Sequence, residues 1–111
     1  MYNHFIANFE TRLSPIRFSI IVSLIGRSFF NSEDALAFYA RILSSKARLG
    51  EEATLCVTMD VVVAKLRVGS VDEAKAILEE GKEKLSTLSS SETIVFSKYY
   101  SAAAEYRKVA Y

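Results

Sequence analysis

The sequence is poor in the residue types that build catalytic and metal centres. Its 111 residues contain one histidine, His4, and one cysteine, Cys56. One histidine cannot supply a histidine-based triad or a multi-histidine metal site, and one cysteine cannot form an internal disulfide. We therefore expect no catalytic residues, no metal and no cofactor. Cys56 is expected to be a buried structural thiol, and the cysteine content suits a reducing compartment.

The sequence also lacks an excess of charge of either sign. Fourteen basic and thirteen acidic side chains give a formal net charge of +1, so there is no electrostatic case for binding nucleic acid or an anionic membrane. Proline occurs once and the four glycines are isolated, which excludes a linker-rich chain and a glycine-rich phosphate loop. With 50% hydrophobic residues, the chain is expected to fold.

A hydrophobic run long enough to cross a membrane is missing. The densest apolar stretch, Ile20 to Ile25, is interrupted by Ser23 and bracketed by Arg17 and Arg27. A spanning helix needs roughly 20 apolar residues, about twice the number that Arg17 and Arg27 enclose. The stretch is therefore predicted to be a helix buried between its neighbours.

What the sequence does contain is helical periodicity along nearly its whole length. Apolar residues recur at spacings of three and four, the pattern of an amphipathic helix. Val61, Val62 and Val63 would also suit a strand, but they lie in an eighteen-residue segment that is too long for an ordinary strand. The predicted helices are Tyr2 to Leu13, Pro15 to Phe30, Glu33 to about Leu49, Glu51 to Val68, Val71 to about Leu88, and a sixth that starts near Glu92.

Turn and cap residues divide these helices. Gly69 stands where a helix C-terminus needs a left-handed residue, and Gly50 is expected to close the third helix. Ser70 is predicted to cap the next helix, with Glu73 at the spacing of a capping box. Ser32 is predicted to cap the third helix in the same way. One helix thus ends and another begins within two residues of Gly69.

The helices repeat with a period of about forty residues. Arg27, Arg67 and Arg107 stand one such period apart, and two-helix repeats of this size are typical of helical arrays. The sequence predicts an all-α fold of about six helices, with antiparallel helix pairs stacked as a right-handed tetratricopeptide-like or HEAT-like solenoid. Residues 1–111 are expected to form one helical-repeat segment of a longer chain, able to self-associate through its exposed helix ends.

Two groups of side chains are candidates for functional sites. Three acidic pairs, at positions 51–52, 72–73 and 79–80, fall on predicted helix surfaces, and two of the pairs lie in first turns where carboxylates favour the helix dipole. They are interpreted as structural. Tyr99, Tyr100 and Tyr106 are the candidate partner-contact residues, because exposed aromatic side chains are favoured anchors at protein interfaces.

Three segments resemble one known family. The first is the aromatic-rich helix from Tyr2 to Leu13 with Ser14 and Pro15 after it, the second is Lys65 to Gly69 before a charged helix, and the third is Phe96 to Tyr100 with Tyr106. Together they resemble the 26S proteasome non-ATPase regulatory subunit 13 family, over almost the whole chain. In that family the chain continues beyond the position of Tyr111 towards a winged-helix module.

The resemblance implies a function that the residues alone do not. It implies a non-catalytic scaffold segment in the lid of the proteasome regulatory particle, supporting ubiquitin-dependent protein degradation. Other lid and regulatory-particle subunits would be its partners, in the cytoplasm and nucleus. The alternative is a generic tetratricopeptide-like module that binds a peptide, or a scaffold of a related complex such as the signalosome or a translation initiation factor.

Overall fold

The computed structural model describes residues 15–44, 50–88 and 93–110, and all their regular structure is helical. The described helices are α2 (Pro15–Ser28), α3 (Ser32–Ser44), α4 (Gly50–Arg67), α5 (Val71–Thr87) and α6 (Thr93–Ala110). This confirms the all-α prediction and most of the predicted boundaries. The predicted helix at Tyr2 to Leu13 lies outside the described residues, as do the end of the predicted third helix and Tyr111.

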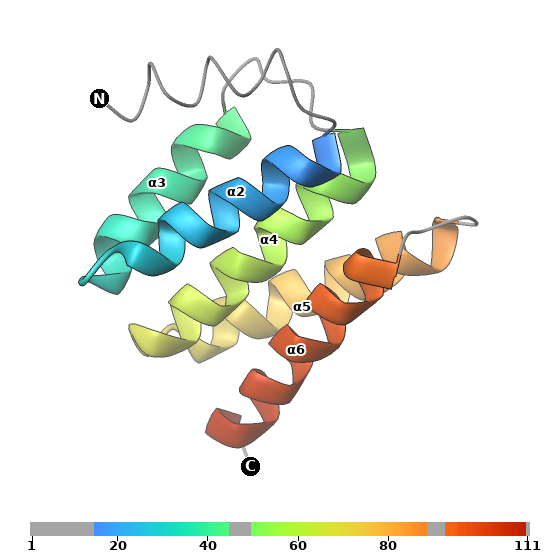
Figure 1. The fold of residues 1–111 in the computed structure, drawn as a ribbon. Coiled ribbons are helices and arrows are strands. Elements are labelled where there is room, and N and C mark those ends of the chain that lie inside the picture. Colours follow the sequence, from blue (N-terminus) through green and yellow to red (C-terminus); the bar gives the residue numbers. More distant parts are fainter. Residues whose placement is uncertain (1–14, 45–49, 89–92, 111) are drawn as a thin grey trace.

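Helix α4 is the centre of the molecule. It contacts each of the other four described helices, and Figure 1 shows it crossing between α2 and α3 on one side and α5 and α6 on the other. Its valines therefore face neighbours instead of forming a strand: Val57 and Val62 are fully buried. A helix that is apolar around most of its circumference is stable only in such a buried position.

Each described helix packs against helices that are one or two positions away from it in chain order. Helices α2, α4 and α6 form a continuous row, because α4 contacts both of the others. Among the described helices, α3 and α5 pack on this row but do not contact each other. The molecule measures 41 × 35 × 19 Å, and the short dimension is about two helix diameters. This arrangement is compatible with a helical-repeat solenoid, whose handedness stays a prediction.

The core has two parts that meet at α4. The first joins α2 and α3 to one side of α4, and the second joins α5 and α6 to the other side. The first part consists of Phe18, Val22, Ala35, Phe38, Tyr39, Ile42, Ala53, Val57 and Ala64. The second consists of Leu55, Cys56, Met59, Val62, Leu66, Ala74, Leu78, Leu85, Val95 and Ala102. One face of α4 serves each cluster, so α4 couples the two halves.

The corner between α4 and α5 confirms the left-handed glycine but corrects the predicted cap. Gly69 has a φ of 88°, and its N–H donates to the Leu66 carbonyl while that of Ser70 donates to the Lys65 carbonyl. These two bonds make a Schellman motif. The predicted capping box is wrong: the Ser70 side chain makes no cap bond. In a capping box the Ser70 N–H would donate to the Glu73 carboxylate. Here it donates to the Lys65 backbone carbonyl instead.

Glu73 instead forms an ion pair across the corner. The Lys65 ammonium lies 2.6 Å from a Glu73 carboxylate oxygen, which joins the last turn of α4 to the first turn of α5. This hydrogen bond and the charge of Lys65 lower the pKa of Glu73. The pair is exposed on the Glu73 side, so its contribution to stability is small.

Two predictions differ from the structure. Asn31, not Ser32, caps α3, because its Oδ1 accepts the Glu33 N–H at 2.7 Å and Ser32 is already helical. Helix α2 is buried on one side only: Ile20 and Leu24 are exposed, because α2 packs only on α3 and α4 among the described helices.

Candidate functional site

A buried polar cluster joins the three helices of the continuous row. Lys98 on α6 donates from Nζ to Asp60 Oδ1 on α4 at 2.5 Å and to Ser23 Oγ on α2 at 2.6 Å. Ser23 in turn donates to Asp60 Oδ1 at 3.2 Å. The Asp60 and Lys98 side chains are only 9% and 14% exposed. Charges this deep must be paired, so the cluster fixes α2 and α6 to the same point of α4.

The cluster contains a serine next to a lysine, a combination that some hydrolases use as nucleophile and base. Here the serine is 5% exposed, and its hydroxyl both accepts from Lys98 and donates to Asp60. The hydroxyl is thus engaged within the fold and is covered from solvent. The arrangement therefore supports a structural role, in which the cluster sets how the helices align.

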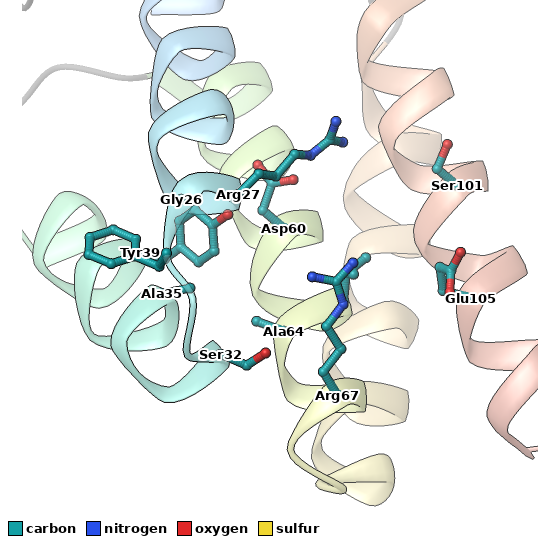
Figure 2. Close-up of a pocket in the computed structure, with 12 residues that line it drawn as sticks. Gly26, Arg27, Ser32, Ala35, Tyr39, Asp60, Ala64, Arg67, Ser101 and Glu105 are labelled. Atoms are coloured by element: carbon teal, nitrogen blue, oxygen red, sulfur yellow. The ribbon is translucent and has the colours of Figure 1, made fainter.

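A cavity of about 290 Å³ lies beside this cluster. It is bounded by the ends of α2 and α4, the start of α3 and one side of α6, as Figure 2 shows. Its lining residues are Gly26, Arg27, Phe29, Ser32, Ala35, Tyr39, Asp60, Val63, Ala64, Arg67, Ser101 and Glu105. The lining is half polar in character, with two arginines at the rim and Asp60 at the buried end.

Gly26 explains how Tyr39 reaches the cavity. A Cβ atom at Gly26 would lie 2.1 Å from the Tyr39 hydroxyl oxygen and 2.3 Å from the ring carbon that carries it. Only glycine allows this approach of the ring to α2. In Figure 2 the Tyr39 hydroxyl points from α3 towards Asp60.

The pKa of Tyr39 reflects the burial and the charges around the cavity. Burial chiefly, and then the negative charge of Asp60, raise the pKa of Tyr39 to about 12, while Arg27 and Arg67 oppose the shift. The neutral phenol is therefore the form that the folded protein favours. Arg27, Arg67 and Tyr39 all line this cavity.

The predicted contact tyrosines lie elsewhere, on α6. Tyr99 and Tyr106 are partly buried and pack against the second core cluster, whereas Tyr100 is 62% exposed. The rings of Tyr99 and Tyr100 meet edge to face, with centroids 5.4 Å apart. None of the three lines the cavity. Their role as partner contacts stays a prediction, with Tyr100 the most accessible of them.

The other candidates are where the sequence predicted them. Cys56 is buried, and burial is the main cause that raises the pKa of its thiol, which makes the thiol unreactive. The three acidic pairs lie on helix surfaces, and only Glu52 among them is partly buried. His4 lies outside the described residues.

Within residues 15–44, 50–88 and 93–110, no three acidic, histidine or cysteine side chains are grouped as a metal ion would require. No helix in these same ranges is both long enough and apolar enough to pass through a lipid bilayer.

Sequence reasoning missed Asp60 and Lys98. The available signal was the position of Asp60, a single carboxylate between Met59 and Val61 inside a largely apolar stretch of a predicted helix. An acid in that position needs a partner. The sequence did not show that the partner would be Lys98, 38 residues away.

Comparison with known proteins gives a consistent result. The model of the family described as PSD13 N-terminal repeats matches residues 1–111. The chain is 25% identical over 114 aligned residues to the 26S proteasome non-ATPase regulatory subunit 13 homolog B of Arabidopsis thaliana, covering 98% of this chain and 29% of the relative. It is 27% identical over 108 residues to the 26S proteasome non-ATPase regulatory subunit 13 of Dictyostelium discoideum, covering 95% of this chain and 28% of the relative.

A second Arabidopsis thaliana relative, homolog A of the same subunit, is 22% identical over 111 residues, which cover 96% of this chain and 29% of that protein. The chain thus spans less than a third of the length of each of these relatives. The family match, in contrast, extends over the whole chain. The chain therefore belongs to the family of PSD13 N-terminal repeats.

Proposed function

We propose that this chain is a scaffold segment of the lid of the 26S proteasome regulatory particle. The observation that carries the proposal is the family match over all 111 residues, together with relatives that are named as proteasome regulatory subunits. The segment would act through protein–protein contacts and so support ubiquitin-dependent protein degradation. Because the chain spans 29% of a relative's length, it supplies part of such a subunit.

The proposed role is non-catalytic. The relatives are named as non-ATPase regulatory subunits, and the polar cluster of Ser23, Asp60 and Lys98 has its groups engaged with one another. A buried ion pair that ties three helices together suits a rigid spacer, since removing either partner would leave an uncompensated charge. Rigidity is what a scaffold requires of its repeats.

The proposed partners are the other lid and regulatory-particle subunits, in the cytoplasm and the nucleus. The accessible Tyr100 and the exposed Ile20 and Leu24 on α2 offer apolar contact area for such neighbours. Self-association of the isolated 111-residue chain belongs to the same proposal, because surfaces that neighbours cover in a complex are free in the isolated chain.

Affinity purification of the full-length protein tests the proposal. The full-length protein, tagged at one end and recovered from cells at native expression, is expected to bring down lid subunits in near-equal amounts. A tagged unrelated helical-repeat protein is the control. Recovery of the full-length protein without proteasome subunits would contradict the proposal, and recovery with a different multisubunit complex would favour the alternative scaffold.

A further inference from the structure

The outer face of α2 is apolar and has no cover among the described residues. It carries Ile20 and Leu24, which stand about one helical turn apart and are 37% and 61% exposed. In the described part of the chain α2 contacts only α3 and α4, and Figure 1 shows it at one end of the row that α4 and α6 continue. Neither residue belongs to a core cluster. Two large apolar side chains thus point away from the core on one face of α2.

The forty-residue period shows which face of α4 corresponds to this one. Asp60 and Ala64 stand forty residues after Ile20 and Leu24, and they are only 8% and 6% exposed. The helix pair that precedes α4 covers them: Asp60 accepts a hydrogen bond from Ser23 of α2, and Ala64 belongs to the cluster that α2 and α3 share with α4. In an array of repeats, the equivalent face of α2 is therefore the one that a preceding helix covers.

The sequence before α2 has the pattern of such a helix. Five apolar residues recur there at spacings of three and four, which places them on one helix face. They are Tyr2, Phe5, Ile6, Phe9 and Leu13. Only Ser14 separates this segment from Pro15, where α2 begins. A connection this short brings two successive helices side by side and antiparallel.

The segment is long enough to cover both exposed residues. As a helix, residues 2–13 would span about 18 Å, and Leu24 lies about 14 Å from the start of α2. In an antiparallel pair that turns just before α2, Phe9 comes level with Ile20 and Phe5 comes level with Leu24. Two aromatic rings of the segment thus meet the two uncovered aliphatic side chains.

We propose that residues 2–13 form a helix that packs on the outer face of α2 and covers Ile20 and Leu24. The occupant is this segment and not a second copy of the chain, because a segment tethered by Ser14 reaches the face at an effective concentration of millimolar order. That is far above the concentration of a second chain in dilute solution. The inference goes beyond the proposed function and does not rest on it. A neighbouring subunit that uses Ile20 and Leu24 must first displace the segment.

Cysteine labelling tests the cover on the 111-residue chain. The natural Cys56 is buried, so a fluorescent maleimide reports a cysteine placed at the surface. Leu24→Cys is the test variant and Tyr100→Cys is the matched control, because the two positions are 61% and 62% exposed. Each labelling rate is divided by the rate of the same variant in urea. We expect Leu24→Cys to label about tenfold more slowly than Tyr100→Cys, or slower still, since the reagent reaches position 24 only while the segment is detached.

Substitutions in the segment identify it as the cover. Phe5→Ser together with Phe9→Ser removes the two rings and is expected to raise the labelling rate of Leu24→Cys to that of Tyr100→Cys. Asn8→Ser is the matched control, since position 8 lies off the apolar stripe, and it should leave the rate unchanged.

The buried thiol serves as the test of folding. Labelling of Cys56, located by mass spectrometry of the peptides, would show that a variant has unfolded. In that case Phe5→Ser alone replaces the double substitution, and it should raise the labelling rate of Leu24→Cys while Cys56 stays unlabelled.

Three results would overturn the proposal. The first is equal labelling of Leu24→Cys and Tyr100→Cys, which would show that the face is uncovered. The second is slow labelling of Leu24→Cys at high protein concentration only, with a matching rise in mass by light scattering, which would make a second copy the occupant. The third is slow labelling that the serine substitutions in the segment leave unchanged.

Discussion

At the scale of single residues, the alignment of α2, α4 and α6 depends most on the ion pair between Asp60 and Lys98. Each of these side chains would be unfavourable in the core without the other. Ser23 adds a third contact from α2, so one carboxylate oxygen gathers donors from two other helices. The stability of the row α2, α4 and α6 should therefore respond strongly to any change that leaves one charge unpaired.

Lys98→Met tests this dependence. The substitution leaves Asp60 buried and unpaired and is expected to lower the free energy of unfolding by about 3 to 5 kcal/mol, the range for breaking a buried pair. Adding Asp60→Asn should recover part of this loss, since no charge is then left. Urea unfolding of the single and double variants measures both effects. The control, Lys108→Met, removes an exposed pair and should cost less than about 1 kcal/mol. Strict additivity of the two core substitutions would contradict the interpretation.

Tyr39 predicts a dependence of stability on alkaline pH. Its pKa is raised from the ordinary 10 to about 12, chiefly by burial and then by Asp60. Between these values the unfolded chain has released the phenolic proton and the folded chain has not, so unfolding becomes easier as pH rises. The contribution of this residue is complete below pH 10 and is lost as pH rises through 12.

Tyr39→Phe has no phenolic proton and should lose less stability than the unchanged chain over that window. Urea unfolding at several pH values between 9 and 12 gives the free energy of unfolding of both proteins. The other tyrosines and the lysines titrate in both, so their contributions cancel when one value is subtracted from the other. Parallel curves for the two proteins would show that Tyr39 ionises as easily in the fold as in water.

The sequence could predict some of these residues and not others. The buried Cys56 and the exposed acidic pairs follow from their places in the helical pattern, because period alone decides which face a side chain occupies. The pairing of Asp60 with Lys98 does not follow from it, and neither does the placement of Arg27 and Arg67 beside one cavity. They depend on which helices pack side by side and at what register, and that is a property of the tertiary structure.

At the scale of helices, the corner at Gly69 agrees best with its prediction, because Gly69 has the left-handed backbone that its position predicted. The space where a Gly69 side chain would stand is open, so the requirement for glycine comes from the backbone alone. With a φ of 88°, the residue occupies a region that glycine reaches freely and other residues reach at a cost.

Gly69→Val is expected to lower the free energy of unfolding by about 1 kcal/mol or more, because a β-branched residue tolerates a positive φ poorly. Gly69→Asn is the matched control and should cost less, since asparagine visits this region more readily. Thermal unfolding followed by circular dichroism compares them. Equal melting temperatures for the valine variant and the unchanged chain would mean that the corner does not need its left-handed residue.

Two helical glycines make a second pair for comparison. A Cβ at Gly26 meets the rigid ring of Tyr39 at 2.1 to 2.4 Å, whereas a Cβ at Gly81 meets the flexible end of Met59 at 2.8 Å. Gly26→Ala is therefore expected to destabilise the chain by about 1 to 3 kcal/mol through overpacking. Gly81→Ala should be near neutral, because Met59 can move and alanine favours the helix by about 1 kcal/mol.

Chemical denaturation of these two variants gives the free energies directly. The reverse order, with Gly81→Ala the more harmful, would show that the contact of α2 with α3 is looser than that of α4 with α5. The structure places Gly81 against Met59 and Leu55 of α4, a close approach that a small residue allows. Nothing in the sequence singled out Gly26, since the approach of Tyr39 depends on how α3 folds back.

At the scale of the whole molecule, the forty-residue period has a structural counterpart. Arg27, Arg67 and Arg107 all lie in the last turns of α2, α4 and α6, where cations favour the negative end of the helix dipole. These are the three helices of the continuous row. The forty-residue period thus marks equivalent helices, and two of its three arginines, Arg27 and Arg67, line the same cavity.

The arrangement around α4 suggests how such a segment would serve an assembly. Helix α4 contacts every other described helix and contributes to both core clusters. A load on the α2–α3 side of the molecule is therefore transmitted to the α5–α6 side through α4. The exposed residues on α2, Ile20 and Leu24, lie outside this core. Contacts can therefore form at the surface without disturbing the packing that gives the segment its shape.

The central claim is that the chain is part of a proteasome lid subunit, and sedimentation tests it most directly. The full-length protein in a cell extract, separated on a glycerol gradient at low salt with ATP, is expected to migrate in the fractions that contain assembled 26S proteasome and peptidase activity. Migration as a free protein in lighter fractions, apart from that activity, would contradict the account.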